Sequence, residues 1–278
     1  MRFRGMSRAE LDAAYDIQAA TGPDALPRYV ADWRARTAQL LASGDAALDL
    51  RYGPEPRQRL DFFRAGDKRP TLAFIHGGYW QRQDKETYRF IAAGPRARGV
   101  NFANIEYTLA PDRTMDGMVA EIAQAVAWLG ANLEPLGGAP DLYLAGHSAG
   151  GHLCATAITA PGVRGGAAIS GIFDLEPIRL GALNDKIGMD EAAARRNSPI
   201  HHVPAQAPAL TIAFGEKELP ELCRQSRDYH GAWIGRGLKG TLMPLVGHDH
   251  FSILDELAKP DGKILAAICA AIDGHTQA

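Results

Sequence analysis

Short apolar segments that alternate with helical segments constrain the fold of this chain more than any other feature. Such runs, without polar alternation, indicate strands that are covered on both faces. Helical patterns lie between most of them, which predicts a mostly parallel sheet with right-handed crossovers and helices on both faces. The six expected strands of this core comprise residues 71–75, 100–105, 142–145, 167–169, 209–214 and 241–246.

Further segments extend this core at its amino-terminal side and within it. Residues 47–52 and 59–64 have the pattern of an antiparallel edge hairpin, which brings the expected sheet to eight strands. Residues 1–45 have the pattern of an N-terminal helical extension. Residues 175–203 exceed the length that a simple crossover needs, so we expect a small cap insertion there. We therefore expect one domain over residues 1–278.

Composition and charge exclude several classes of protein. Hydrophobic residues make up 46% and charged residues 22% of the chain, which is typical of a globular domain rather than a disordered or fibrous one. Lysine and arginine number 30 against 32 acidic residues, so we expect no binding to nucleic acid and none to an anionic membrane. No secretory or membrane-spanning stretch is evident, and the three cysteines are widely spaced. These features predict a cytoplasmic protein.

The strongest local motif is Gly-His-Ser-Ala-Gly at residues 146–150. It follows the expected strand at 142–145 and precedes a helical run at 153–158, which is the context of a nucleophile elbow. The glycines allow a tight turn that lifts the serine hydroxyl above the carboxyl edge of the sheet. We therefore expect Ser148 to be a nucleophile, with an incidental serine in a glycine-rich turn as the alternative.

A second motif, His-Gly-Gly-Tyr-Trp at residues 76–80, follows the expected strand at 71–75. An acyl-transfer enzyme needs fixed donors for the negative oxygen of its tetrahedral intermediate. A glycine loop in this place can present backbone N–H groups, joined by the amide that follows the nucleophile. The expected oxyanion hole therefore comprises the amides of Gly78, Tyr79 and Ala149.

The side chains of this second motif suggest further roles. We expect His76 to hold the loop by hydrogen bonding rather than to act in catalysis. Tyr79 and Trp80 are candidates for binding substrate, although ordinary core packing is the alternative for Trp80. Their aromatic faces could stack on an aryl leaving group.

A serine hydroxyl needs a base to take its proton and a carboxylate to orient that base. Glu216 and Glu218 follow the expected strand at 209–214, and His248 and His250 follow the last strand. The order serine, acid, histidine at successive strand ends is typical of one large group of hydrolases. The residues by themselves leave both glutamates open as the acid.

These motifs resemble those of serine hydrolases of the α/β-hydrolase fold, and within that fold the kynurenine formamidase (arylformamidase) branch. His-Gly-Gly-Tyr-Trp, Gly-x-Ser-Ala-Gly-Gly and a late Asp-His-Phe carry the resemblance, which covers about residues 52–257. It implies an eight-stranded α/β-hydrolase fold with a small cap. It assigns the base to His250 and the acid to Glu218, where aspartate is the commoner residue. Glu216 and Asp174 remain alternatives for the acid.

The resemblance also implies a function. It predicts a hydrolase that cleaves a small-acyl amide, above all an N-formyl arylamine such as N-formyl-kynurenine, through an acyl-enzyme on Ser148. A carboxylesterase for short-acyl esters or carbamates would use the same groups, and a binding module on a degenerate scaffold is a third reading. We expect no metal and no cofactor, because the paired histidines at 248 and 250 lack a third ligand at a recognisable spacing. The expected partners are a small-molecule substrate and, as an option, a second copy of the chain in a homodimer.

Overall fold

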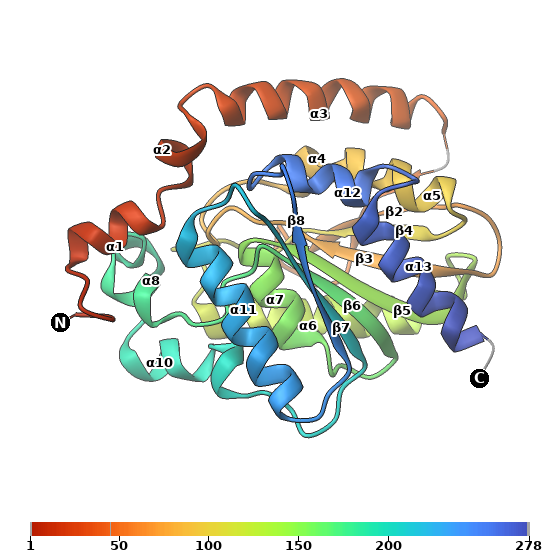
Figure 1. The fold of residues 1–278 in the computed structure, drawn as a ribbon. Coiled ribbons are helices and arrows are strands. Elements are labelled where there is room, and N and C mark those ends of the chain that lie inside the picture. The colour runs from red at the N-terminus through yellow and green to blue at the C-terminus, as the bar shows by residue number, and fades with distance from the viewer. Residues whose placement is uncertain (1, 45, 277–278) are drawn as a thin grey trace.

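A central eight-stranded sheet organises the molecule, which we describe from a computed structural model covering residues 2–44 and 46–276. The strands lie in the order β1-β2-β4-β3-β5-β6-β7-β8, and helices cover both faces of the sheet (Figure 1). Within the two described ranges, no helix is both long and apolar enough to cross a membrane.

All eight strands expected from the sequence are present. The pairings of β1 with β2 and of β2 with β4 are antiparallel, and the other five pairings are parallel. The mostly parallel sheet and the edge hairpin are therefore confirmed. The strands are β1 (Ala46–Arg51), β2 (Arg59–Phe63), β3 (Arg69–Ile75), β4 (Asn101–Ile105), β5 (Gly138–His147), β6 (Val163–Ile169), β7 (Ala209–Gly215) and β8 (Gly240–Leu245).

Two hydrophobic clusters lie on the two sides of this sheet. Ala73 and Ile75 of β3 enter one cluster, whereas Leu72 and Phe74 enter the other, as the two-residue period of a strand requires. All four side chains are fully buried, which explains why the strand is continuously apolar in sequence.

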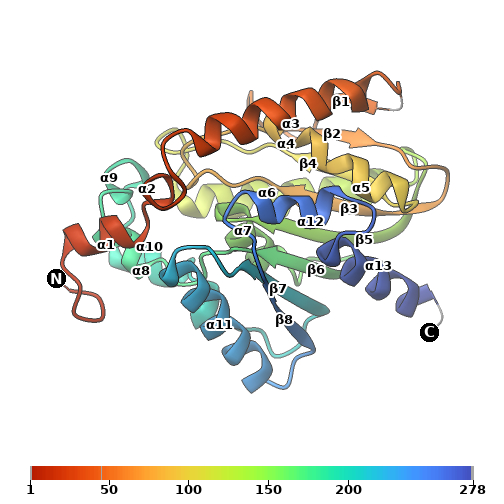
Figure 2. The same ribbon diagram turned by 45° about the horizontal axis from the view of Figure 1, so that its top comes forward.

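Different helices cover the two faces of the sheet, as two views of the molecule show (Figures 1 and 2). On the first side lie α6 (Met115–Asn132), α7 (Ala149–Ala157) and α11 (Pro220–Gly235). On the second side lie α3 (Ala25–Leu41), α4 (Lys85–Tyr88), η1 (Arg89–Ala92), α5 (Ala93–Ala97), η3 (Ser252–Leu254), α12 (Asp255–Ala258) and α13 (Lys263–Thr276).

The amino-terminal helices pack onto the body of the molecule. Trp33 of α3 is almost completely buried and stacks on Phe90, with ring centroids 5.0 Å apart. The two preceding helices, α1 (Arg8–Ala14) and α2 (Ile17–Thr21), lie beside the segment between β6 and β7 (Figure 2). That segment forms α8 (Glu176–Leu180), α9 (Asn184–Ile187), α10 (Glu191–Arg196) and η2 (Pro199–His201).

Candidate active site

Ser148 lies at the sharp turn between β5 and α7. Its backbone angles, φ 57° and ψ −120°, fall in a region that non-glycine residues rarely adopt. The turn is also closely packed, because a Cβ on Gly150 would lie 2.0 Å from the carbonyl oxygen of Ile75. Strain of this kind is typical of functional sites. The local structure therefore agrees with the elbow expected from the sequence.

Glu218 and His250 meet above the carboxyl ends of β7 and β8. The Nδ1 atom of His250 lies 3.1 Å from Oε2 of Glu218, and both residues are buried. The other carboxylate oxygen accepts the Gly215 N–H at 2.9 Å and the hydroxyl of Ser170. Because Nδ1–H donates to the carboxylate, Nε2 of His250 is left as the acceptor nitrogen that a base requires.

The remaining candidates for acid and base have other contacts. Asp174 accepts the Glu176 N–H at 3.0 Å and so caps the following turn, whereas Glu216 is exposed. His248 pairs with Glu256 at 2.9 Å. In the described part of the chain, none of these three candidates is bonded to the imidazole described above.

The expected oxyanion donors lie in the loop between β3 and α4, which we call the oxyanion loop (residues 76–84), and at the start of α7. The loop turns tightly at Gly78, where φ is 110°. The turn needs glycine, because a Cβ there would lie 2.2 Å from the carbonyl oxygen of Arg82. Across residues 2–44 and 46–276, the amides of Gly78, Tyr79 and Ala149 donate to no other backbone or side-chain group. They are therefore available to a developing oxyanion.

The two aromatic residues of the oxyanion loop point in different directions. Tyr79 lines the cavity, and its hydroxyl donates to the carbonyl oxygen of Tyr15 at 2.7 Å. Trp80 is fully buried in the core, and its indole N–H donates to Nδ1 of His152 at 3.3 Å. Trp80 therefore has the core position that the sequence analysis gave as its alternative, whereas Tyr79 borders the cavity.

His76 contacts the loop as the sequence predicts. Its Nδ1 lies 2.8 Å from the carbonyl oxygen of Gly77, and the ring is completely buried outside the cavity. A role in holding the loop thus agrees with its surroundings.

A cavity of about 440 Å³ opens above Ser148 and His250, a size suited to a small organic ligand. Three segments far apart in sequence form most of its walls: the first two helices, the oxyanion loop, and the segment between β6 and β7. The apolar lining includes Leu11, Tyr15, Ile17, Leu26, Pro177, Ile178, Leu183 and Phe251. Both segments outside the sheet core therefore border the cavity.

Two site residues escaped the sequence analysis. His147 precedes Ser148, lines the cavity and lies 2.8 Å, through Nε2, from the carbonyl oxygen of His250. Burial holds the pKa of His147 well below its usual value, so the ring is neutral and Nε2 carries the proton. Ser170 donates to Glu218 from the end of β6. The sequence offered a signal for both residues, because His147 is a polar residue next to Ser148 and Ser170 is a polar residue directly after β6.

Comparison with known proteins places this geometry among hydrolases. The chain matches the BD-FAE family over residues 63–164. It is 30% identical to a kynurenine formamidase of Salmo salar, over 94% of this chain and 95% of that protein. A structure from Silicibacter sp. TM1040, described as a candidate thioesterase, has 30% identity and a TM-score of 0.82 over 94% of this chain and 99% of that one. An esterase of Pyrobaculum calidifontis has the same fold, with 20% identity and a TM-score of 0.69 over 89% and 92% of the two chains.

Proposed function

Because the chain belongs to the kynurenine formamidase family of α/β hydrolases, we propose that it removes the formyl group from an N-formyl arylamine such as N-formyl-kynurenine. That the chain is a hydrolase follows from its similarity to kynurenine formamidases and esterases. One observation carries the proposed chemistry: His250, bonded to Glu218 at 3.1 Å, lines the same cavity as Ser148. This arrangement supports acyl transfer through a covalent intermediate.

The first half of the reaction forms the acyl-enzyme. The Ser148 oxygen attacks the formyl carbon while Nε2 of His250 takes the hydroxyl proton, and the carbonyl electron pair moves onto oxygen. The amides of the oxyanion hole stabilise that oxygen. The intermediate then collapses, the C–N bond breaks, and His250 returns the proton to the departing arylamine nitrogen. Glu218 keeps the imidazole in the required tautomer and stabilises its positive charge.

The second half of the reaction regenerates the enzyme. Water attacks the formyl ester on Ser148 while His250 takes a proton from it, and a second tetrahedral intermediate forms. Its collapse breaks the bond to the serine oxygen, which recovers a proton from His250. The products are formate and the free arylamine.

The cavity supports a substrate of amino-acid type. It is lined by charges of both signs, with Asp12 and Asp16 on the amino-terminal segment and Arg82 on the oxyanion loop. Burial raises the pKa of Tyr79, the charge of Asp16 raises that pKa further, and the charge of Arg82 lowers it. Both charged residues therefore lie on the part of the cavity wall that includes Tyr79. N-formyl-kynurenine carries an ammonium and a carboxylate at the end remote from the formyl group. We propose that Asp16 and Arg82 bind these two groups.

A short-acyl carboxylesterase is the second candidate function. The similarity to esterases favours it, because the same nucleophile, base and oxyanion donors serve esters and carbamates. The two candidates differ in the acyl group and in the leaving group, so a comparison of substrates separates them.

The central experiment compares kcat/KM for N-formyl-kynurenine, N-formylaniline and p-nitrophenyl acetate. We expect the formamides to be preferred, and a strong preference for the acetate would overturn the formamidase proposal in favour of the esterase.

Ser148→Ala should lower kcat by about 10⁵–10⁶ without lowering Tm, since triad residues act as a unit. Retention of more than about one per cent of the activity would remove Ser148 as the nucleophile.

The substrate class has its own test in Arg82→Gln. Loss of a charge-assisted hydrogen bond should raise KM for N-formyl-kynurenine about tenfold, while KM for N-formylaniline, which has no carboxylate, stays unchanged. Arg195→Gln is the matched control, because Arg195 is exposed and lies on α10 outside the cavity lining. Equal effects on both substrates would show that Arg82 does not bind the carboxylate.

A further inference from the structure

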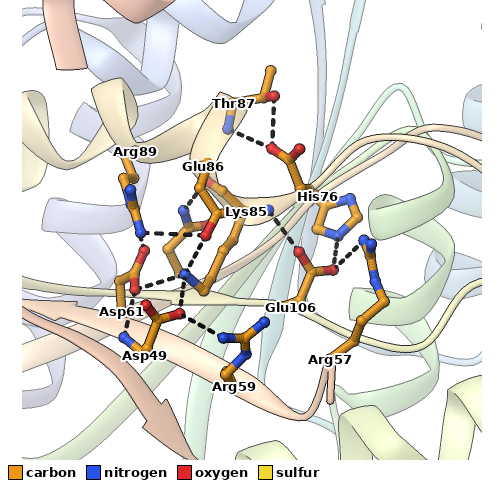
Figure 3. Close-up of polar contacts among 12 residues, drawn as sticks. Asp49, Arg57, Arg59, Asp61, His76, Lys85, Glu86, Thr87, Arg89 and Glu106 are labelled. Atoms are coloured by element: carbon orange, nitrogen blue, oxygen red, sulfur yellow. Dashed lines mark hydrogen bonds and ion pairs between the residues drawn. The ribbon is translucent and has the colours of Figure 1, made fainter. Parts of the chain in front are cut away.

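One buried carboxylate contacts both ends of the oxyanion loop. Glu106 directly follows β4 and is only 3% exposed. Its Oε1 lies 2.9 Å from Nε2 of His76, the first residue of the loop, as Figure 3 shows. Its Oε2 accepts the backbone N–H of Lys85, the first residue after the loop, at 2.9 Å. A single side chain thus joins the two points where the loop leaves the fold.

The same carboxylate accepts two further donors. The Tyr107 N–H lies 3.0 Å and the Arg57 guanidinium 2.7 Å from Oε1. Arg57 also donates to the carbonyl oxygen of Gln83 within the loop, at 2.7 Å. Burial by itself raises the pKa of Glu106, but His76 and Arg57 outweigh it and hold the pKa at about 2. Glu106 is therefore ionised and accepts from every partner.

The surroundings of His76 determine its charge. Nδ1 lies 2.8 Å from the Gly77 carbonyl oxygen, which can only accept, so Nδ1 carries a proton. Nε2 faces the ionised carboxylate of Glu106, which also only accepts, so Nε2 carries a proton as well. The ring packs between Tyr107 and Tyr88, with ring centroids 4.6 and 5.8 Å away. Both hydrogen-bond partners of this imidazole are therefore acceptors, which requires the doubly protonated form.

The far end of the loop is fixed by a second set of charges. The Lys85 side chain is 1% exposed, and its ammonium lies 2.9 Å from Asp49, 2.9 Å from Asp61 and 2.7 Å from Glu86 (Figure 3). These carboxylates offset the desolvation that would otherwise lower the pKa of Lys85. Its backbone N–H, bonded to Glu106, is thus a rigid anchor rather than a movable one.

We propose that Glu106 and a doubly protonated His76 are positioning residues, which hold the oxyanion loop so that the Gly78 and Tyr79 amides meet the developing oxyanion. This inference rests on the proposed function, because it takes the attack of Ser148 on a carbonyl as given. Neither side chain touches the substrate. Both act through the backbone, because His76 binds the carbonyl oxygen of Gly77 at the start of the loop and Glu106 binds the amide of Lys85 directly after its end.

Glu106→Gln distinguishes this role from simple packing. The glutamine amide has nearly the same shape as the carboxylate. It replaces one of the two accepting oxygens by an NH₂ group, which can only donate, whereas the two oxygens of Glu106 together accept four hydrogen bonds. Its nitrogen must therefore face either the donors at Oε1 or the Lys85 N–H, and one end of the loop loses its acceptor. A displacement of about 1 Å at a reacting group costs up to about 10²-fold in rate. We expect kcat to fall about 10- to 10²-fold while KM stays unchanged.

Glu121→Gln is the matched control. Glu121 is 4% exposed, accepts the Thr108 N–H at 2.8 Å and pairs with Arg113 at 2.7 Å, but among the described residues it forms no bond to the oxyanion loop. The Glu121→Gln variant should be less stable than the wild type, because a buried carboxylate is replaced, but its kcat should be unchanged. All rates are measured with p-nitrophenyl acetate, since an oxyanion forms on any ester and the test does not depend on the preference for formamides.

A transition-state analogue provides the readout that a merely structural role would not move. A trifluoromethyl ketone that adds to Ser148 places an oxyanion in the hole, so its affinity for Glu106→Gln should fall in parallel with kcat. Wild-type kcat in this variant would overturn the proposal. Equal losses of kcat and Tm in both glutamine variants would also overturn it, by reducing the effect to destabilisation. Activity retained by Ser148→Ala would instead reveal a failure of the proposed function.

A measurement on the unmodified protein covers the case in which Glu106→Gln fails to fold. In ¹⁵N NMR of histidine-labelled protein at neutral pH, the His76 ring, assigned through its contacts with Tyr88 and Tyr107, should show two protonated nitrogens. A ring with one unprotonated nitrogen would overturn the assigned charge and with it the proposal.

Discussion

At the scale of single residues, four buried histidines differ because their ring nitrogens face different groups. Both nitrogens of His76 face acceptors, which requires a cation. His152 donates through Nε2 to the Asn197 carbonyl oxygen and accepts the indole N–H through Nδ1, which requires a neutral ring. His147 also donates through one nitrogen, and His250 keeps one nitrogen for the cavity. The same residue type therefore occupies the position proposed for an anchor, a position in the core and the position proposed for the base.

The assignment of the acid can be tested at this scale. Glu218→Gln should lower kcat by about 10⁴, because an amide no longer holds the imidazole of His250 in the required tautomer. Glu216→Gln should leave kcat close to that of the wild type, since Glu216 is exposed. Steady-state kinetics on one ester substrate measure both variants. The reverse ranking would assign the acid to Glu216.

The buried neutral histidines predict how stability changes with pH. Burial lowers the pKa of His152 from 6.5 to about 4, so between these values the unfolded chain binds more protons than the folded one. The free energy of unfolding should therefore fall as the pH drops below 6.5, by up to about 1.4 kcal/mol per pH unit for this ring. Urea titrations down to about pH 5 measure the slope, where few carboxylates titrate.

A control isolates the ring responsible. His152→Gln should show a shallower dependence over the same range, because glutamine does not titrate. Identical slopes in the two proteins would contradict a neutral His152 with a lowered pKa.

At the scale of elements, parallel strands bring the site together. The oxyanion loop follows β3, Ser148 follows β5, Glu218 follows β7 and His250 follows β8. Because β3, β5, β6, β7 and β8 all run in the same direction, their carboxyl ends lie at one edge of the sheet. The close contact of α7 with the end of β3 then places Ser148 beside the oxyanion loop.

That close contact predicts the effect of a single methyl group. A Cβ on Gly150 would lie 2.0 Å from the Ile75 carbonyl oxygen and 2.6 Å from that of His76, both backbone atoms that cannot move cheaply. Gly150→Ala should lower the free energy of unfolding by about 3 kcal/mol or more. Gly130→Ala, in α6 with no atom of the described residues within 4 Å of the new Cβ, should raise it by up to about 1 kcal/mol. Urea denaturation compares the two, and equal effects would contradict the tight elbow.

At the scale of the whole molecule, the amino-terminal segment completes the cavity. Asp12 accepts the Ala182 N–H at 2.6 Å, and Arg8 pairs with Asp185, so α1 is bound to the segment between β6 and β7. The Tyr15 carbonyl oxygen accepts the Tyr79 hydroxyl and thereby joins the same helices to the oxyanion loop. The wall opposite the sheet therefore depends on residues that lie far from the triad in sequence.

Removal of residues 1–22 should open this wall while retaining α3, whose Trp33 belongs to the core. We expect KM for N-formyl-kynurenine to rise about tenfold or more, because the aromatic and charged lining is lost. The kcat for p-nitrophenyl acetate should change little, since Ser148, Glu218 and His250 come from the sheet edge. Steady-state kinetics of the truncated protein, folded by circular dichroism, test this. An unchanged KM for the larger substrate would show that the segment does not bind it.

Local patterns in the sequence predicted much of this protein. Apolar runs of strand length located the six strands β3 to β8, and the pattern of an edge hairpin located β1 and β2. The reason is clearest in β3, because a strand buried on both faces must be apolar along its length. Glycines on both sides of Ser148 predicted the elbow, because only glycine fits where backbone approaches backbone. The family resemblance added the pairing of Glu218 with His250, which spacing alone left open.

Only the tertiary structure decided how distant residues meet. Trp80 enters the core while the adjacent Tyr79 lines the cavity. These positions depend on the hydrogen bond from Trp80 to His152 and on the hydrogen bond from Tyr79 to Tyr15. The charge of His76 follows from Glu106, which lies thirty residues later along the chain. Such contacts depend on how the whole sheet and its helices pack, whereas hydrophobic periodicity and turn preference act between near neighbours along the chain. Periodicity therefore predicts strands, helices and turns, and packing determines which side chains form the site.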